Sequence, residues 1–233
     1  MSVLVVQHEV GCTPAWFGEW LPFALDVRHP YRGDALPSSL ADHAGLVVLG
    51  GSMGAYDDAD CPWLPATKAL LRFGVDSGLP TLGICLGHQL LAVACGGVVE
   101  KAPDGPYIGV VTLESTQESA DDPLLGALTF PACTARWNGD VVTSLPAGAV
   151  PVAADSSGRV QAARFGPSAW GLQFHPEAGA EVFATWAEEV RATPDGPSLE
   201  PLIAAGLAEV SAAEEALAST GRRLADAFAA TVR

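Results

Sequence analysis

The chain has 233 residues, of which 49% are hydrophobic and 17% are charged, and this balance is typical of a compact globular protein with a sizeable core. No charge-free apolar run is long enough to cross a bilayer, so we expect no membrane partner. The formal net charge of −15 argues against nucleic acid as a partner, because nucleic acids attract basic surfaces.

The first part of the chain alternates apolar strands with amphipathic helical patterns. Strands are predicted at residues 3–6, 46–49 and 80–84, and helices at residues 66–76 and 88–95. The apolar run at the N-terminus has no basic region before it and no cleavage site after it, so we interpret it as a buried strand and not as a signal peptide. Together with the odd number of cysteines, 5, this predicts a cytoplasmic protein with free thiols.

The second half changes character, because its predicted strands are short and closely spaced. They fall at residues 98–101, 108–113, 150–154, 160–164 and 169–174, with turn signals at 156–158 and 166–167. We expect them to be antiparallel strands or hairpins added to the sheet. The fold class predicted for the whole chain is α/β: a mostly parallel central sheet flanked by helices, flavodoxin-like, with added antiparallel strands in the second half.

A break rich in proline and glycine at residues 193–198 precedes an alanine-rich tail. Leucine, glutamate and arginine recur in the tail at helical spacing, which predicts two helices. Their apolar stripes need burial, so packing on the same domain is favoured over a docking surface for a synthase subunit or a second copy. We therefore expect a single domain at residues 1–233, with a catalytic core at 1–192 and a helical extension at 193–233.

The stretch TLGICLGHQL at residues 81–90 places one cysteine between two glycines, where an apolar strand meets an apolar helix. This is the pattern of a nucleophile elbow, a sharp turn that exposes Cys85. Gly83 and Gly87 tolerate the crowding and the unusual dihedral angles of such a turn. The start of a helix also favours a thiolate over a thiol. We predict that Cys85 is the nucleophile and that the remaining cysteines are structural or incidental: Cys12, Cys61, Cys95 and Cys133.

At these residues the chain resembles the class I, or triad, glutamine amidotransferases. Four residues match the family signature G-x-C-x-G-x-Q: Gly83, Cys85, Gly87 and Gln89. Two further motifs occur in the family's order, since LGGSMG at residues 49–54 is similar to the oxyanion loop and QFHPE at residues 173–177 is similar to the histidine and glutamate motif. The ordered set is specific, and the resemblance is strongest to the glutaminase domain of GMP synthetase.

A thiolate nucleophile needs a group that transfers protons and a second group that orients the first. His175 and Glu177 can supply these roles, because residues two apart in an extended segment point to the same side. Pro176 stiffens the segment between them. Alone, this His-Pro-Glu sequence would equally suit a surface turn. Together with the elbow, it predicts a triad of Cys85, His175 and Glu177.

The tetrahedral intermediate of acyl transfer needs N–H donors for its oxyanion. We expect these donors to be the backbone N–H groups of Leu86, the residue after the nucleophile, and of Gly51 in the glycine loop. The glycine loop lacks the lysine of a Walker motif and the spacing of a dinucleotide-binding motif. An oxyanion hole is therefore favoured over a phosphate site.

The resemblance also implies substrate contacts. Gln89 is expected to contact the bound glutamine, although it would also suit a tie between the elbow and a neighbouring loop. Trp137, Asn138 and Asp140 belong to WNGD at residues 137–140, where many family members have WHGD in a loop that holds the amino-acid end of the substrate. Asn138 departs from that pattern. Asp140 would either pair with an α-ammonium group or cap a turn, and both interpretations stay open.

The other histidines are not expected to take part in catalysis. His88 lies too close in sequence to Cys85 to accept its proton, so we predict a packing or hydrogen-bonding role for it. His8, His29 and His43 have no spacing that brings them together with cysteine or carboxylate ligands. We therefore expect neither a metal nor another cofactor.

The predicted function is hydrolysis of the γ-amide of glutamine through a cysteinyl thioester, which releases glutamate and ammonia. Since no synthase domain is recognisable in the chain, the ammonia would pass to a separate synthase partner or be released. Two alternatives stay open. One is a γ-glutamyl hydrolase or peptidase that uses the same triad, and the other is a non-catalytic binding protein on the same fold. A homo-oligomer is also compatible with the sequence.

Overall fold

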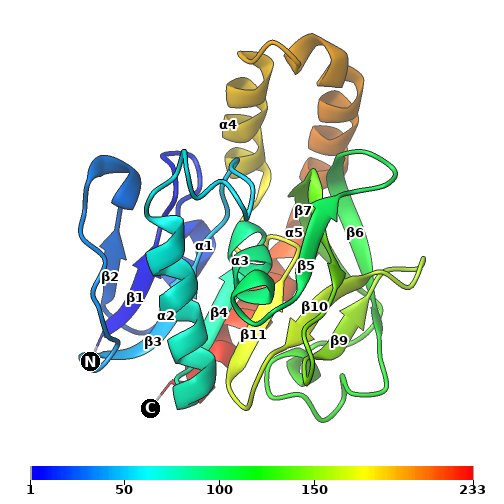
Figure 1. Cartoon of the computed structure of the whole chain (residues 1–233). Coiled ribbons are helices and arrows are strands. Elements are labelled where there is room, and N and C mark those ends of the chain that lie inside the picture. The colour runs from blue at the N-terminus through cyan, green and yellow to red at the C-terminus, as the bar shows by residue number, and fades with distance from the viewer. Residues whose placement is uncertain (1, 233) are drawn as a thin grey trace.

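A computed structural model describes residues 2–232, and a nine-stranded mixed sheet runs through their centre (Figure 1). The strands lie side by side in the order β2 (Leu25–Arg28), β1 (Ser2–Val6), β3 (His43–Val48), β4 (Thr81–Ile84), β11 (Ala169–Leu172), β10 (Val160–Arg164), β9 (Val150–Ala154), β6 (Tyr107–Ser115) and β7 (Ala132–Asn138). The first five are parallel, and the other four continue the sheet in antiparallel pairs. A separate antiparallel pair consists of β5 (Val98–Lys101) and β8 (Asp140–Ser144).

This architecture confirms the predicted α/β fold class, but the second half differs from the expectation. β7 and β8 are strands for which no prediction was made, and β5 pairs with β8 outside the main sheet. The sequence places residues 169–174 among the added antiparallel strands, yet β11 pairs in parallel with β4 and antiparallel with β10. β11 is therefore the strand at which the parallel part of the sheet ends. Because β4 leads to Cys85 and β11 leads to His175, the two side chains start from neighbouring strands that run in the same direction.

Helices cover both faces of the sheet (Figure 1). Alternate residues of β1 point to opposite faces, so Leu4 and Val6 pack with α2 (Leu64–Ser77) and α3 (Leu86–Ala94), while Val3 and Val5 pack with α1 (Ala15–Trp20) and α5 (Gly196–Thr231). α4 (Ala180–Arg191) and the start of α5 form a helical hairpin that rises from the body beside β6 and β7. Short 3₁₀ helices lie at Pro30–Arg32 and Leu125–Ala127. Among residues 2–232, none of the helices is both long and apolar enough to cross a membrane.

A single helix, α5, occupies most of the tail, so the prediction of two helices is wrong. α5 continues without a break for 36 residues. Two glycines inside it are points of close contact and not helix ends. A Cβ on Gly206 would lie 2.6 Å from the carbonyl oxygen of Ile108, and a Cβ on Gly221 would overlap the carbonyl oxygen of Pro176. Both contacts hold α5 against the rest of the molecule, and the burial of its apolar stripe stabilises it along its length.

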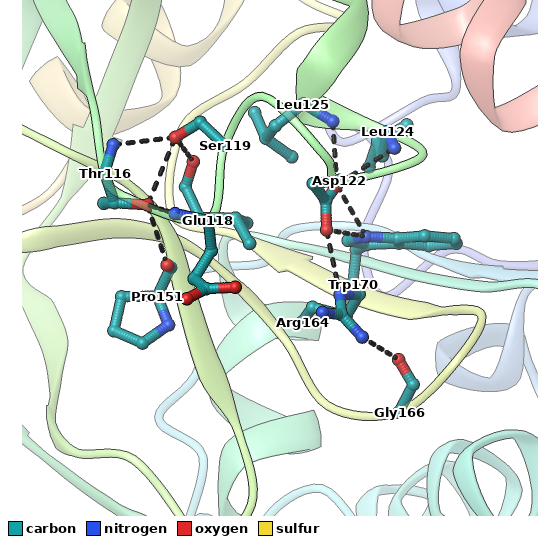
Figure 2. A network of polar contacts seen from close by, with 11 residues as sticks. Thr116, Glu118, Ser119, Asp122, Leu124, Leu125, Pro151, Arg164, Gly166 and Trp170 are labelled. Carbon is teal, nitrogen blue, oxygen red and sulfur yellow. Dashed lines mark hydrogen bonds and ion pairs between the residues drawn. The ribbon is translucent and has the colours of Figure 1, made fainter.

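A buried aspartate ties the loop between β6 and β7 to the sheet (Figure 2). Asp122 accepts hydrogen bonds from Nε1 of Trp170 at 3.1 Å and from Nε of Arg164 at 3.0 Å. The backbone N–H groups of Leu124 and Leu125 donate to the same carboxylate, both at 2.9 Å. These four donors compensate a negative charge that would otherwise be costly to bury. β11 is thereby anchored at its start, before it leads to the candidate site.

Candidate active site

Cys85 lies in a strained turn between β4 and α3. Its backbone has a φ of 50° and a ψ of −104°, and residues with a side chain rarely adopt a positive φ. The turn leaves no room beside it, because a Cβ on Gly87 would overlap the carbonyl oxygen of Val48 and a Cβ on Gly83 would overlap the backbone of Gly87. The turn thus has the shape of the nucleophile elbow that the glycine spacing predicts.

The Cys85 side chain borders a cavity of about 300 Å³ at the carboxyl ends of the parallel strands. The loops after β1, β3, β4 and β11 meet here, since the carboxyl ends of parallel strands share one edge of the sheet. The end of α4 and the segment after it complete the rim, so Thr193, the first residue of the expected helical extension, also borders the cavity. The residues that line it are Glu9, Cys12, Gly51, Ser52, Cys85, Trp137, His175, Trp186, Glu189, Val190 and Thr193.

His175 and Glu177 follow β11 and form a buried pair. Nδ1 of His175 lies 2.8 Å from Oε1 of Glu177, and each side chain is only 3% exposed. Burial alone would lower the pKa of His175. The negative charges of Glu177 and of a Cys85 thiolate, together with hydrogen bonds to both, outweigh burial and raise that pKa from 6.5 to about 10. The arrangement therefore favours a protonated imidazole beside Cys85.

One backbone carbonyl approaches both Cys85 and His175. The carbonyl oxygen of Trp137 lies 3.6 Å from Sγ of Cys85 and 3.4 Å from Nε2 of His175. Because a carbonyl oxygen only accepts hydrogen bonds, it favours a proton on Nε2. Nδ1 faces the carboxylate of Glu177 at the same time, so both ring nitrogens face acceptors, as the imidazolium form requires. On another side of the thiol, Nε2 of Gln173 lies 3.8 Å from Sγ.

The glycine loop after β3 lies against the elbow. A Cβ on Gly50 would lie 3.2 Å from Cε1 of His175 and 3.6 Å from Cβ of Cys85, and a Cβ on Gly51 would lie 3.0 Å from Cδ2 of Leu86. Within residues 2–232, neither the N–H of Gly51 nor that of Leu86 has a hydrogen-bond acceptor. The two expected oxyanion donors therefore lie on loops in contact, with both N–H groups available to a ligand.

Of the four residues expected to contact substrate, Trp137 lines the cavity. Its ring packs edge-on against Phe183 and Trp186, with ring centroids 5.4 Å and 6.0 Å apart. Trp186 also lies beside the His175 ring, at 4.7 Å between centroids, and donates from Nε1 to the carbonyl oxygen of Gly11 at 2.9 Å. An aromatic wall from β7 and α4 thus covers one side of the cavity.

Gln89, Asn138 and Asp140 do not border the cavity as the structure describes it. Nε2 of Gln89 donates to the carbonyl oxygen of Asp140 at 2.9 Å, and Nδ2 of Asn138 donates to the same oxygen at 2.8 Å. The carboxylate of Asp140 pairs with Nζ of Lys101 at 2.7 Å. These three residues join the elbow helix to the turn between β7 and β8, and their contact with substrate stays a prediction.

The sequence reasoning missed the cavity residues that β1 and α4 supply. Cys12, interpreted as structural or incidental, lies in the cavity wall, with Sγ 3.1 Å from Oε1 of Glu9. Burial is the larger cause of a raised pKa of the Cys12 thiol, and the negative charge of Glu9 is the next. Oγ of Ser52 donates to the other oxygen of Glu9 at 2.6 Å. Burial is the main cause of a raised pKa of Glu189 on α4, and the negative charge of Glu9 raises it further. The signal for Glu9 and Cys12 was their place just after a predicted parallel strand, because such strand ends meet at one edge.

Two buried histidines lie near the site without lining the cavity. His88 packs edge-on against Phe165, and neither of its ring nitrogens has a hydrogen-bond partner among the described residues. Nδ1 of His8 accepts a hydrogen bond from Nε1 of Trp63 at 3.0 Å. Burial lowers the pKa of both histidines to about 4. Both are therefore neutral near pH 7, in contrast to His175.

A second cavity differs from this one in its lining. A larger cavity, of about 770 Å³, opens near the starts of β3 and β4, at the opposite edge of the sheet. Its described lining includes His43 but no cysteine. Among residues 2–232, no three or more histidine, cysteine, aspartate or glutamate side chains gather in a way that could hold a metal ion.

Comparisons with known proteins identify the family whose members this chain resembles. The family model described as glutamine amidotransferase class-I matches residues 27–186. The glutamine-hydrolysing GMP synthase of Thermomicrobium roseum is 37% identical over 150 residues, which cover 64% of this chain and 26% of that protein. A glutamine amidotransferase-like protein of Salmonella typhimurium, YfeJ, is 26% identical over 188 residues, or 78% of each chain. The chain spans about a quarter of the length of the GMP synthase that it matches.

Solved structures show the same fold over almost the whole chain. A glutamine amidotransferase from Thermotoga maritima superposes with a TM-score of 0.83 at 26% identity, over 98% of both chains. A glutamine amido transferase from Methylobacillus flagellatus superposes with a TM-score of 0.84 at 27% identity, over 100% of this chain and 95% of the other.

Proposed function

Because the chain belongs to the class I glutamine amidotransferase family, we propose that it hydrolyses the γ-amide of glutamine and releases glutamate and ammonia. One observation carries the proposal. Cys85 sits in a strained elbow and lines the same cavity as His175, whose other ring nitrogen is held by Glu177 at 2.8 Å. A nucleophile, a proton carrier and an orienting carboxylate on adjacent loops are the parts that acyl transfer needs.

In the proposed reaction, Sγ of Cys85 attacks the γ-carboxamide carbon, and the carbonyl π electrons move to the oxygen. The N–H groups of Gly51 and Leu86 stabilise that oxyanion. The C–N bond then breaks, and Nε2 of His175 gives its proton to the departing ammonia, which leaves a thioester on Cys85. His175 next takes a proton from water, which attacks the thioester and releases glutamate. Glu177 orients His175 throughout.

The fate of the ammonia forms the second part of the proposal. The matched relative from Thermomicrobium roseum is a glutamine-hydrolysing GMP synthase, of which this chain covers about a quarter. We therefore propose that the ammonia passes to a synthase active site outside the region that this chain shares with that relative.

Glutamine is favoured over larger γ-glutamyl amides by the size of the cavity. Its volume of about 300 Å³ lies at the lower end of the range for ligand pockets, roughly 300–1,000 Å³. A γ-glutamyl hydrolase or peptidase would use the same three side chains on a larger leaving amine, so it would need a roomier pocket. A purely binding role gives no reason for the strained backbone of Cys85 to be combined with the His175–Glu177 pair.

The test is covalent labelling followed by a substrate panel. A glutamine analogue with a diazoketone electrophile is expected to add once to the wild-type chain, as measured by intact mass, and not to add to Cys85→Ala. Cys95→Ala is the matched control, because Cys95 is a partly exposed free thiol outside the cavity and its loss is expected to leave labelling intact.

Ammonia release from glutamine and from γ-glutamyl peptides then separates the two enzyme readings. Faster release from glutamine supports glutaminase activity, whereas faster release from the peptides supports a γ-glutamyl hydrolase or peptidase instead. Labelling that persists in Cys85→Ala, or that never occurs, would contradict the catalytic assignment.

A further inference from the structure

The glycine loop after β3 is held at its two ends but makes few contacts of its own in the middle. At one end, the backbone N–H of Leu49 donates to the carbonyl oxygen of Val6 at 3.0 Å. At the other end, the backbone N–H of Gly54 donates to the carboxylate of Asp57 at 2.6 Å. For residues 50–53, no backbone N–H or carbonyl group has a hydrogen-bond partner within the described part of the chain. Backbone hydrogen bonds therefore do not fix the middle of this loop.

One side-chain hydrogen bond holds the middle of the loop to the segment after β1. Oγ of Ser52 donates to Oε2 of Glu9 at 2.6 Å, across 43 residues of sequence. A hydroxyl group that donates to a carboxylate at this distance makes a charge-assisted hydrogen bond, about twice as strong as a neutral one. Glu9 is half-buried, and both side chains border the cavity. We call this hydrogen bond the Glu9 latch.

The segment that carries Glu9 is itself fixed at several points. Nε2 of Gln7, a buried side chain, donates to the carbonyl oxygen of Glu9 at 2.8 Å. The second carboxylate oxygen of Glu9, Oε1, lies 3.1 Å from Sγ of Cys12. The carbonyl oxygen of Gly11 accepts a hydrogen bond from Nε1 of Trp186 at 2.9 Å, which ties the segment to α4. Glu9 is therefore a defined support to which the glycine loop can be tied.

The residue before Ser52 is Gly51, which carries the N–H group that would be positioned. A Cβ on Gly51 would lie 3.0 Å from Cδ2 of Leu86 and 3.1 Å from Cβ of His8, so this residue fits between the elbow helix and the segment after β1. Glycine has more backbone freedom than other residues, and it has no side chain that packing could fix. A hydrogen bond made by the next residue restricts the rotations that would turn the Gly51 N–H away from the cavity.

We propose that Glu9 and Ser52 are positioning residues, and that the hydrogen bond between them keeps the N–H of Gly51 directed at the place where the oxyanion forms. The proposal rests on the proposed function, because it assigns a role in the same acyl transfer. Neither side chain exchanges a proton or forms a bond with the substrate in this role. The latch acts through the loop, since a donor that is already oriented stabilises the developing charge without a cost of reorganisation.

The test breaks the latch from both sides. Ser52→Ala removes the donor, and Glu9→Leu removes the acceptor while keeping a side chain of similar size. Glu9→Gln keeps an acceptor oxygen for Ser52 and removes the charge, so it separates the latch from attraction of a cationic group on the substrate. Thr143→Val is the matched control: Oγ1 of Thr143 donates to Oε2 of Glu100 at 2.7 Å, also across 43 residues, on the β5–β8 pair outside the cavity.

The first readout is kinetic. We expect Ser52→Ala and Glu9→Leu each to lower kcat for glutamine about ten- to a hundredfold with little change in KM, because a misdirected donor loses stabilisation of the transition state. The double variant should lose no more than either single variant, since both changes remove one bond. Glu9→Gln should lose less than Glu9→Leu. Alkylation of Cys85 by iodoacetamide should keep the wild-type rate in all of them, because substitution at a saturated carbon forms no oxyanion.

The second readout does not depend on activity. In protein made with isotope-labelled glycine, the amide NMR signal of Gly51 is assigned by its loss in Gly51→Ala. We expect one sharp Gly51 signal in the wild type and in Thr143→Val. The signal should broaden or split in Ser52→Ala and in Glu9→Leu, because the loop then samples more than one conformation.

Several outcomes would overturn the proposal. Losses that multiply in the double variant, a raised KM, or a Glu9→Gln variant as slow as Glu9→Leu would assign Glu9 to direct contact with the substrate. An unchanged kcat in Ser52→Ala and Glu9→Leu, or a Gly51 signal that neither variant alters, would show that the latch does not position the loop. Failure of the proposed function appears separately, as a wild-type chain that releases no ammonia from glutamine, and the Gly51 signal then decides for or against the latch.

Discussion

Replacing Glu177 by glutamine tests whether the buried pair sets the protonation of His175. The change removes the carboxylate charge 2.8 Å from Nδ1 and keeps the shape of the side chain. The pKa of His175 is raised from 6.5 to about 10 because Glu177 and Cys85 outweigh burial. Without the charge of Glu177, burial regains its influence, so we expect the pKa of His175 to fall toward or below 6.5.

The size of the effect follows from linkage. A histidine whose pKa is raised by folding stabilises the fold fully when the pH is below its pKa in the unfolded chain, near 6.5. This stabilisation is lost as the pH rises through its pKa in the folded chain, about 10. One pKa unit corresponds to about 1.4 kcal/mol, so the wild-type chain should lose on the order of 3 to 5 kcal/mol of its free energy of unfolding across this window. We expect Glu177→Gln to remove most of that pH dependence.

Denaturant unfolding is measured at a series of pH values between the unfolded and the folded pKa of His175, and the rate of glutamine hydrolysis is measured in parallel. Glu214→Gln is the control, because Glu214 also accepts a hydrogen bond, from the backbone N–H of Ala180 at 3.2 Å, but lies outside the cavity. Hydrolysis at neutral pH should fall by roughly a hundredfold or more in Glu177→Gln, since the imidazole loses its orienting charge. An alkaline loss of stability equal to that of the wild type would refute the reasoning.

Three further outcomes are expected from the same structure. Gly51→Ala should lower kcat by about 10² or more with a smaller effect on KM. The added Cβ would lie 2.6 Å from Sδ of Met53 and 3.0 Å from Cδ2 of Leu86, so it would displace an oxyanion donor. Steady-state kinetics on a variant of equal thermal stability would check this. His88→Leu should weaken the loss of stability as pH falls from about 6.5 toward 4, because folding lowers the pKa of His88 to about 4 and the unfolded chain binds the proton first; identical acid unfolding curves would contradict this. Asp122→Asn should lower the free energy of unfolding by about 2 to 4 kcal/mol, because it leaves Arg164 and Trp170 without a carboxylate partner. A denaturant midpoint close to that of the wild type would show that other contacts anchor the loop.

The elbow could be predicted from the sequence because its signals are local. Gly83 is required by a contact within a few residues of Cys85, and Gly87 by a contact with β3, the neighbouring strand in the sheet. The apolar runs on either side of Cys85 show where the strand and the helix lie. The His-Pro-Glu segment is equally local, because its two side chains meet across one intervening residue.

The burial of β7 could not be predicted in the same way. Its apolar residues alternate with polar ones, a pattern that predicts a strand with a solvent-exposed polar face. The polar residues Thr134, Arg136 and Asn138 are nevertheless buried. The partners of Arg136 lie far away in sequence: Tyr107 is on β6, and Asp155 follows the end of β9. A buried polar strand of this kind is stabilised by tertiary contacts that a pattern of residue types does not contain.

The cavity wall shows the same limit for single residues. Cys12 follows Gly11 but is not bracketed by glycines and lies in no motif, and it reaches the cavity only because the loop after β1 and the loop after β3 end at one sheet edge. α4 differs, since Phe183, Trp186 and Ala187 recur at helical spacing and are buried. That pattern is present in the sequence, although no helix was predicted there, whereas the contact between α4 and the cavity leaves no such signal.

The pairing of β4 with β11 has a consequence for the order in which the molecule comes apart. Ile84 and Leu172 are partners in the middle of the sheet, and the backbone N–H of Cys85 donates to the Leu172 carbonyl oxygen at 2.7 Å. Amide hydrogen exchange at Cys85 should therefore require opening of the central strands, whereas the helical hairpin at the rim can fray at lower cost. The reactive turn would then belong to the last cooperative unit to unfold, and moderate stress would release the walls of the cavity before it separates the thiol from its imidazole.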